Sequence, residues 1–339
     1  MTIFFLTSGS KSGILKAIKQ EETMMEEKET IQYTAPASAD EPVFAPEPPK
    51  AAMRRVFSRI AIGLCIGLLL SQLVPTVLAA VLPDFDAQAH AFLVGGLCTG
   101  LFTLPLMLLL TRRLPQRKPA RSTLSVGGFL ALVTISYACM IVGNLVGIGI
   151  NTLISPNSVN LIGDLASAAG LSVEMVVAFV VLAPVFEELV FRKVLVDRVL
   201  PYGEWPAILF SGLTFGLFHG NLTQFFYATL LGMVLAYVYI RWGNILYTIG
   251  IHACINFLGG VLPQLVPAAS YFMLLIVIAG IVLFFVFKKS IRVEKNAVPG
   301  VGGAMFGNVG MILFMILGCL LMGLVVLVMN RPELSQGLL

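Results

Sequence analysis

The chain has 339 residues, of which 58% are hydrophobic and only 12% are charged, and its mean hydropathy is +0.92. Soluble proteins carry roughly 25% charged residues, so this chain has too little charge to cover a water-soluble globule. The net charge of +4 is small, and its basic residues are dispersed, so we expect no nucleic-acid partner. The composition predicts an all-α, polytopic membrane protein.

Residues 1–53 differ from the rest of the chain, because they contain the acidic run 21–29 and a proline-rich stretch at 36–49. Such a segment cannot bury enough apolar surface to offset the entropy of ordering. We expect a disordered cytoplasmic tail that acts as a solvated tether. No basic residue precedes the short apolar stretch 2–7, so no cleaved signal is expected.

Nine apolar runs reach or approach the ~20 residues that a helix needs to cross the hydrocarbon layer. They lie at 56–82, 90–111, 124–150, 173–195, 206–220, 222–240, 244–262, 269–288 and 309–329. The run 206–220 is the shortest. We expect two N-terminal transmembrane helices within 54–122, a membrane core at 123–262 and two C-terminal transmembrane helices within 263–339.

Basic residues in the connections indicate the orientation of the helices. Arg and Lys occur before the first run, between the second and third, at the ends of the fourth and sixth, and after the eighth. The intervening loops, such as 83–90, 155–170 and 263–270, contain neither. Nine spans in a cell membrane with a cytoplasmic N-terminus satisfy every connection, and only Arg331 falls on the outer side.

Five cysteines lie in apolar runs without a CxxC pair, which argues against a disulfide framework or a thiolate metal site. Three GxxxG segments favour close helix packing inside the chain, although such segments also occur at dimer interfaces. They begin at Gly96, Gly143 and Gly212. The sequence does not determine the oligomeric state.

The fourth run contains charged residues, each costing roughly 2.5–3.5 kcal/mol at the centre of a bilayer. Glu187 and Glu188 are adjacent, and Arg192 follows. Glu188 and Arg192 are four residues apart and share one helix face within ion-pair reach, whereas Glu187 is rotated by about 100°. Pro184 is expected to kink the helix. Alternatively, the two carboxylates merely end the span among the cytoplasmic headgroups.

The fifth and seventh runs contain two of the chain's three histidines. His219 follows Phe215 by four residues, and Asn256 follows His252 by four. His90 lies at a loop end and receives no role. A lone histidine in a membrane helix is often only a hydrogen-bond partner, but two Glu, one Arg, two His and one Asn on three spans indicate one shared site.

These side chains are sufficient for the attack of water on an amide. A carboxylate shielded from water can act as a general base, and a neutral imidazole can hold the same water or ligate a metal. A second His and an Asn amide can donate hydrogen bonds to an oxyanion. The same residues would also suit a zinc site of Glu187, His219 and His252. No HExxH or GxSxG segment is present.

The motifs Glu187-Glu-x-x-x-Arg192, Phe215-x-x-x-His219 and His252-x-x-x-Asn256 resemble the signatures of the CAAX protease and bacteriocin-processing (CPBP) family. The resemblance covers roughly 170–260 and implies that the core 123–262 is the catalytic part of an intramembrane endopeptidase. Eukaryotic members remove the last three residues of prenylated CAAX proteins, and bacterial members are often linked to bacteriocin maturation or immunity.

Carried over to this chain, the resemblance implies that Glu187 activates the hydrolytic water together with His219. His252 and Asn256 would stabilise the oxyanion or hold that water, and Glu188 and Arg192 would orient the site. The cofactor is either none or a divalent metal such as zinc. We favour the metal-free form, because only two histidines are at hand and Asn is a poor zinc ligand.

Two other functions remain compatible with the sequence: a non-catalytic immunity or scaffold protein, and a proton-coupled transporter. The transporter is less favoured because no inverted repeat is visible. The expected partners are membrane lipid and a peptide or protein substrate near the membrane, whose identity and prenylation the sequence does not specify.

The expected helix boundaries place the two main site residues at different depths. If the fifth helix starts at Trp205, a rise of about 1.5 Å per residue puts His219 near the outer side, whereas Glu187 lies nearer the cytoplasmic end of its helix. We therefore expect 202–206 to dip into the membrane or the fifth helix to be strongly tilted.

Overall fold

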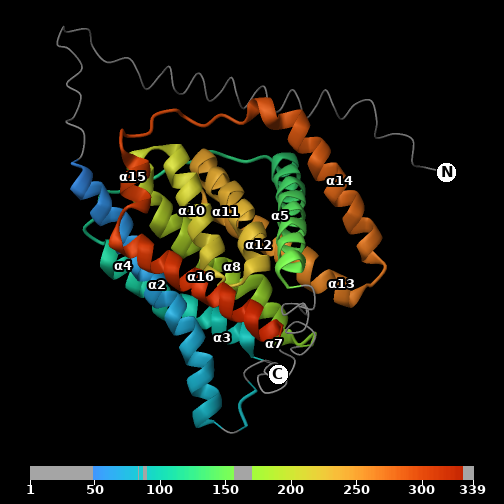
Figure 1. Cartoon of the computed structure of the whole chain (residues 1–339). Coiled ribbons are helices and arrows are strands. Elements are labelled where there is room, and N and C mark those ends of the chain that lie inside the picture. Colours follow the sequence, from blue (N-terminus) through green and yellow to red (C-terminus); the bar gives the residue numbers. More distant parts are fainter. Residues whose placement is uncertain (1–48, 83, 87–89, 156–169, 331–339) are drawn as a thin grey trace. The chain divides into compact units, whose positions relative to one another are not determined.

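The computed structural model describes residues 49–82, 84–86, 90–155 and 170–330. Within this part of the chain all regular structure is helical and there is no strand (Figure 1). Seven of the described helices are long and apolar enough to cross a membrane, so the chain is an all-α membrane protein. They span Lys50–Val81, Ala91–Thr111, Val126–Ile154, Leu222–Trp242, Ile245–Leu265, Ala269–Ser290 and Val309–Val328.

Five of these spans are built mainly from single α-helices, and two contain a π-helical turn. The single helices are α2 (Lys50–Val81), α5 (Val126–Ile154), α11 (Leu222–Trp242), α14 (Ala269–Phe287) and α16 (Val309–Met329). The divided spans consist of α3 (Ala91–Cys98), η1 (Thr99–Thr103) and α4 (Leu104–Thr111), and of α12 (Ile245–Asn256), η5 (Phe257–Val261) and α13 (Leu262–Leu265). A short helix, α15 (Val301–Phe306), precedes α16.

Of the predicted tail 1–53, residues 1–48 lie outside the described residues. Its last part is helical, because α2 begins at Lys50 instead of at the predicted residue 56. The predicted boundary was therefore a few residues too late. Val56, Phe57 and Ile60 are buried, whereas most of the last turns of α2 are exposed.

The two remaining predicted spans, 173–195 and 206–220, form a helical hairpin. Its first arm runs without a break through α7 (Val173–Val177), η2 (Ala178–Leu182), α8 (Ala183–Glu188), η3 (Leu189–Val196), α9 (Asp197–Val199) and η4 (Leu200–Tyr202). Gly203 makes the turn with a φ of 123°, which favours glycine. The second arm is α10 (Glu204–Phe218), whose 15 residues measure about 22 Å, less than the ~30 Å hydrocarbon layer. Nine crossings therefore remain a prediction.

The first arm is longer than predicted, and this removes the difference in depth. The helix does not end at 195 but continues to Tyr202. Glu187 lies sixteen residues before Gly203, and His219 lies sixteen residues after it. Two antiparallel arms of equal length bring both residues to the same level, so neither a dip at 202–206 nor a strong tilt is needed.

Three π-helical segments each precede a proline, and one of them lies next to Glu187. The residue directly before the proline donates its N–H five residues back, from Leu104 to Thr99, from Ala183 to Ala178 and from Leu262 to Phe257. Proline lacks an N–H and its ring displaces the carbonyl one turn earlier, so a wider turn accommodates it. The kink predicted at Pro184 thus takes the form of the π segment η2.

The connections with basic residues meet at one end of the helices, here called the basic end. Backbone N–H groups of Arg117, Ser122 and Val298 donate to the carbonyls of Asp197, Trp242 and Tyr202, respectively. At the other helix ends, His90 pairs with Glu174, and Ser155 donates to Asn330. The helix ends therefore fall into the same two groups as the connections with and without Lys or Arg.

The three GxxxG segments pack against neighbouring helices of the same chain, as predicted. Gly96 and Gly100 lie against α8 and η2, Gly143 and Gly147 lie against the backbone of α11, and Gly212 and Gly216 lie against Thr229 and its neighbours on α11. The closely packed α10–α11 pair positions the second and third motifs. By contrast, α14 packs mainly on α5 and buries only Met273 and Gly280, so most of its apolar surface is available to lipid.

Candidate functional site

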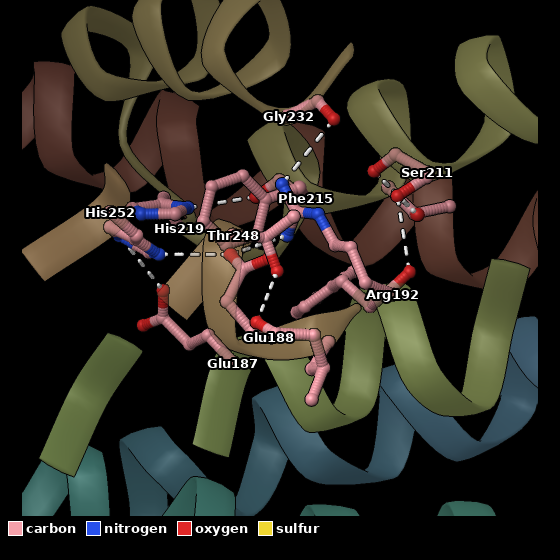
Figure 2. A network of polar contacts seen from close by, with 12 residues as sticks. Glu187, Glu188, Arg192, Ser211, Phe215, His219, Gly232, Thr248 and His252 are labelled. Atoms are coloured by element: carbon pink, nitrogen blue, oxygen red, sulfur yellow. Dashed lines mark hydrogen bonds and ion pairs between the residues drawn. The ribbon is translucent and has the colours of Figure 1, made fainter. Parts of the chain in front are cut away.

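The side chains of the three motifs come from the hairpin and α12, and all except Asn256 meet beside α11 (Figure 2). Glu187 and Glu188 end α8, Arg192 lies in η3, His219 follows α10, and His252 lies in α12. The hairpin fixes the relative level of the carboxylates and His219, and the packing of α12 on α8 adds the second histidine.

Glu188 and Arg192 form the ion pair that their spacing predicts. Glu188 Oε1 lies 3.1 Å from Arg192 Nη1, and both side chains are fully buried. Arg192 also donates from Nη2 to the Gly232 carbonyl at 3.3 Å, and its guanidinium lies over the Phe215 ring at 4.6 Å. Glu188 is thus enclosed by protein and paired, instead of being exposed at the end of a helix.

His252 bridges the two adjacent carboxylates (Figure 2). Its Nδ1 lies 2.9 Å from Glu188 Oε1, and its Nε2 lies 3.7 Å from Glu187 Oε2. The Glu187 side chain is 18% exposed, whereas that of Glu188 is 0% exposed. Glu187 is therefore the carboxylate that an entering molecule can reach, and Glu188 is a buried support for His252 and Arg192.

The neutral His219 ring leaves its Nε2 nitrogen unprotonated. Its Nδ1 lies 2.7 Å from the Phe215 carbonyl oxygen, which can only accept, so Nδ1 carries the proton of the neutral ring and Nε2 keeps its lone pair. Figure 2 shows the imidazoles of His219 and His252 beside each other.

The Phe215 ring is the common contact of this cluster. It meets the His219 ring edge-on with centroids 4.9 Å apart and the His252 ring edge-on at 5.8 Å, and it also carries the Arg192 guanidinium. One rigid ring therefore packs against both imidazoles and against the Arg192 guanidinium. The phenylalanine of the second motif thus has a physical reason that the sequence alone does not supply.

Asn256 has a backbone partner that the sequence did not predict. Its Nδ2 donates to the Phe179 carbonyl at 2.8 Å. In the π register of η2 that carbonyl would accept from residue 184, but Pro184 has no N–H, and the N–H of Ala183 goes to Ala178. Asn256 therefore supplies the missing donor. It holds the π segment one turn before Glu187, and within the described residues its side chain makes no hydrogen bond to either histidine or either carboxylate.

Buried polar atoms in the cluster retain hydrogen-bonding capacity. Within the described part of the chain, Glu188 Oε2 and Arg192 Nε are buried and have no hydrogen-bond partner. Such atoms are rare in folded proteins, since each unsatisfied buried group costs roughly 1–3 kcal/mol.

The donors Glu187, His219 and His252 are of the types that bind zinc, and an imidazole whose Nδ1 is hydrogen-bonded suits a metal site. The placement of these three side chains fits a metal site less well than their chemical types do. Among the residues that the structure describes, no group of three or more His, Cys, Asp or Glu side chains is arranged to hold a metal ion. The reaction steps below therefore use only the side chains of the chain.

Two residues that the sequence analysis did not single out also reach the cluster. The Gly232 carbonyl accepts from Arg192, and Tyr227 lies edge-on to His219 with ring centroids 6.3 Å apart. Both belong to α11. Gly232 lies against Gly212, a packing that the sequence does not show, and tyrosine is common in membrane helices, so nothing in the sequence marked either residue.

Comparison with known families supports the resemblance. Residues 169–258 match the family model for Type II CAAX prenyl endopeptidase Rce1-like proteins, which is consistent with the CPBP family. The matched segment contains all seven named residues of the three motifs. No curated protein and no solved structure matches the chain. At the level of the family, the match supports an intramembrane protease.

Proposed function

We propose that this chain is an intramembrane endopeptidase that hydrolyses a peptide bond of a membrane-associated peptide or protein. The observation that carries the proposal is the placement of Glu187. It is a partly exposed carboxylate in an apolar helix, 3.7 Å from His252, whose imidazole lies beside that of His219 (Figure 2). These are the groups that would hold and deprotonate one water molecule.

In the proposed reaction, a water molecule donates one hydrogen bond to the Glu187 carboxylate and the other to His219 Nε2. Its oxygen attacks the carbonyl carbon as Glu187 takes the proton, and the carbonyl oxygen becomes an oxyanion. The protonated Glu187 then gives this proton to the leaving nitrogen as the carbon–nitrogen bond breaks. The products are a carboxylic acid and an amine, and Glu187 returns to its starting state.

The other motif residues would position these groups. Glu188 accepts from His252 Nδ1 and is itself held by Arg192, so His252 is kept beside Glu187. Asn256 would act through the backbone of η2. This differs from the sequence-based hypothesis that Asn256 contacts the oxyanion or the water.

The site lies within the helices, at a distance from the basic end that can be counted along α12 and α16. His252 is seven residues from the start of α12, or about 10 Å, and that start adjoins the basic end. Gly220, next to His219, lies against Leu321, which is twelve residues from the start of α16, or about 18 Å. We place the basic end and the N-terminus in the cytoplasm, so the substrate would reach the site through the cytoplasmic half of the cell membrane.

The test compares the peptides released by membranes that carry the wild-type chain or the Glu187→Gln variant. The substitution preserves size but removes the base, so we expect release of the specific products to fall by about 10²–10⁴-fold while the protein still inserts and accumulates. The matched control is Glu174→Gln, because Glu174 is half-exposed and pairs with His90 away from the cluster. Its products should equal those of the wild type.

The same experiment separates the protease from a scaffold or immunity protein. In a scaffold, the cluster only joins helices, and no released peptide would depend on Glu187. If the biological activity of Glu187→Gln equals that of the wild type, the proposed hydrolysis is wrong.

A further inference from the structure

The proposed reaction needs a hydrogen-bond donor for the oxyanion, and the motif residues provide few. His252 directs Nδ1 at Glu188 and Nε2 at Glu187. Asn256 uses one of its two amide hydrogens on the Phe179 carbonyl. Arg192 is fully buried between Glu188, Gly232 and Phe215. A donor from another element would complete the site.

Tyr227 is a side chain with a suitable position. It lies on α11, and its ring meets the His219 imidazole with centroids 6.3 Å apart at an interplanar angle of 70°. The side chain is only partly buried, so an entering molecule can contact it. Its backbone is fixed, because Gly143 of α5 lies directly against the Tyr227 main chain.

The phenolic oxygen of Tyr227 has one defined partner, and that partner is a donor. Gln224 Nε2 donates to Tyr227 Oη at 2.8 Å. Gln224 is held in turn, because its backbone N–H donates to Oδ1 of the helix-capping residue Asn221. Since Oη accepts from Gln224, the phenolic proton is available to a second acceptor, and the described residues offer none within hydrogen-bond distance.

A hydrogen bond that a phenol accepts strengthens the one that it donates. Gln224 therefore both orients the Tyr227 hydroxyl and makes it a better donor. The arrangement has the parts that an oxyanion contact requires: a donor without a partner, a fixed backbone, and proximity to the groups that would hold the water.

We propose that Tyr227 is a further catalytic residue, which donates a hydrogen bond to the carbonyl oxygen of the scissile peptide bond, with Gln224 as its positioning residue. This inference rests on the proposed function. As water attacks, the carbonyl electron pair moves to the oxygen, and the Tyr227 hydrogen bond to it strengthens. The phenol keeps its proton throughout, and the leaving nitrogen receives its proton from Glu187.

The competing interpretation is that the Tyr227–Gln224 hydrogen bond only stabilises the first turns of α11. Removing the hydroxyl would then lower thermal stability without changing turnover. Tyr247 provides a matched control, because its hydroxyl accepts from the Leu124 N–H and has a purely structural contact.

The experiment measures kcat, KM and the thermal midpoint of purified full-length protein in lipid vesicles. Its substrate is a synthetic peptide that spans the bond whose cleavage depends on Glu187. Tyr227→Phe should lower kcat by about 10²–10³-fold, with KM nearly unchanged. Tyr247→Phe should keep the wild-type kcat. Gln224→Glu should also lower kcat, because the new carboxylate accepts a hydrogen bond from the phenol, which then no longer donates to the substrate.

Wild-type kcat in Tyr227→Phe, together with an inactive Glu187→Gln, would overturn the inference and leave the proposed function intact. Should Tyr227→Phe fail to fold, a wild-type kcat in Gln224→Glu would overturn it equally. If no peptide is cleaved in a Glu187-dependent manner, the proposed function itself fails.

Discussion

The first arm of the hairpin carries two polar clusters, and they differ in how completely their hydrogen bonds are filled. Near the basic end, Asp197 accepts from Tyr239 Oη at Oδ1 and from Lys193 Nζ at Oδ2, each at 2.8 Å. Further along the arm, Glu188 shares one oxygen between Arg192 and His252, and its other oxygen has no hydrogen-bond partner in the described part of the chain.

This difference separates a polar cluster that stabilises the fold from one that is available to a substrate. The Asp197 cluster is satisfied within the protein, so its removal should affect stability. The Glu187–Glu188 cluster contains a partly exposed carboxylate and unfilled polar atoms, so the loss of its exposed members should affect activity. The predictions below test this contrast.

The largest effect on stability is expected for Arg192→Leu. The substitution leaves the fully buried Glu188 carboxylate without its cation, and breaking a buried pair in this way costs about 3–5 kcal/mol. We expect a protein that accumulates poorly and unfolds at a lower temperature in detergent. Thermal unfolding of the purified protein measures the effect.

The double variant Glu188→Gln/Arg192→Leu is the matched control. It removes the unpaired charge and keeps an acceptor for His252 Nδ1. It should regain most of the lost stability but not the activity. Equal instability of the single and the double variant would contradict the assignment of the loss to an unpaired charge.

A smaller effect is expected for Asn256→Ala. It leaves the Phe179 carbonyl without a donor, which costs about 1–3 kcal/mol, and it loosens the π segment before Glu187. The measurement is the thermal midpoint together with the cleavage rate.

Pro184→Ala in the same chain should restore part of both. An alanine at this position supplies the N–H that Pro184 lacks, five residues after Phe179 in the π register. If Asn256→Ala abolishes cleavage at wild-type stability and Pro184→Ala gives no recovery, Asn256 contacts the substrate and does not act through η2.

The smallest effect is expected for removal of divalent cations. Because the described residues contain no group of three donors arranged for a metal, we expect the cleavage rate to be unchanged after dialysis against a chelator. Loss of cleavage with recovery on addition of zinc would instead assign Glu187, His219 and His252 as metal ligands.

The sequence predicted the membrane helices well where apolar runs were uninterrupted, and less well where charge was buried. The run 269–288 corresponds closely to α14. The predicted first arm of the hairpin ended too early, at 195, because Arg192, Lys193 and Arg198 were interpreted as the basic residues of a connection. In the structure these side chains have partners within the protein, such as Glu188, Asp197 and the Thr111 carbonyl.

The candidate site was predictable where it depends on spacing along one helix. The four-residue separation of Glu188 and Arg192 predicted their ion pair, which forms at 3.1 Å. Specific contacts between helices could not be predicted from the sequence. The Asn256 bond to Phe179 depends on the register of a π turn, and the position of Tyr227 depends on how α10 packs against α11.

The most direct test of the contrast between the two clusters measures cleavage rate and thermal midpoint for Glu187→Gln and Asp197→Asn in one set of membranes. We predict opposite patterns. Glu187→Gln should lose cleavage and keep its midpoint, whereas Asp197→Asn should lose stability, by about 1–3 kcal/mol, and keep the cleavage rate of each folded molecule. If Glu187→Gln loses stability but still cleaves, the cluster joins helices and is not a hydrolytic site.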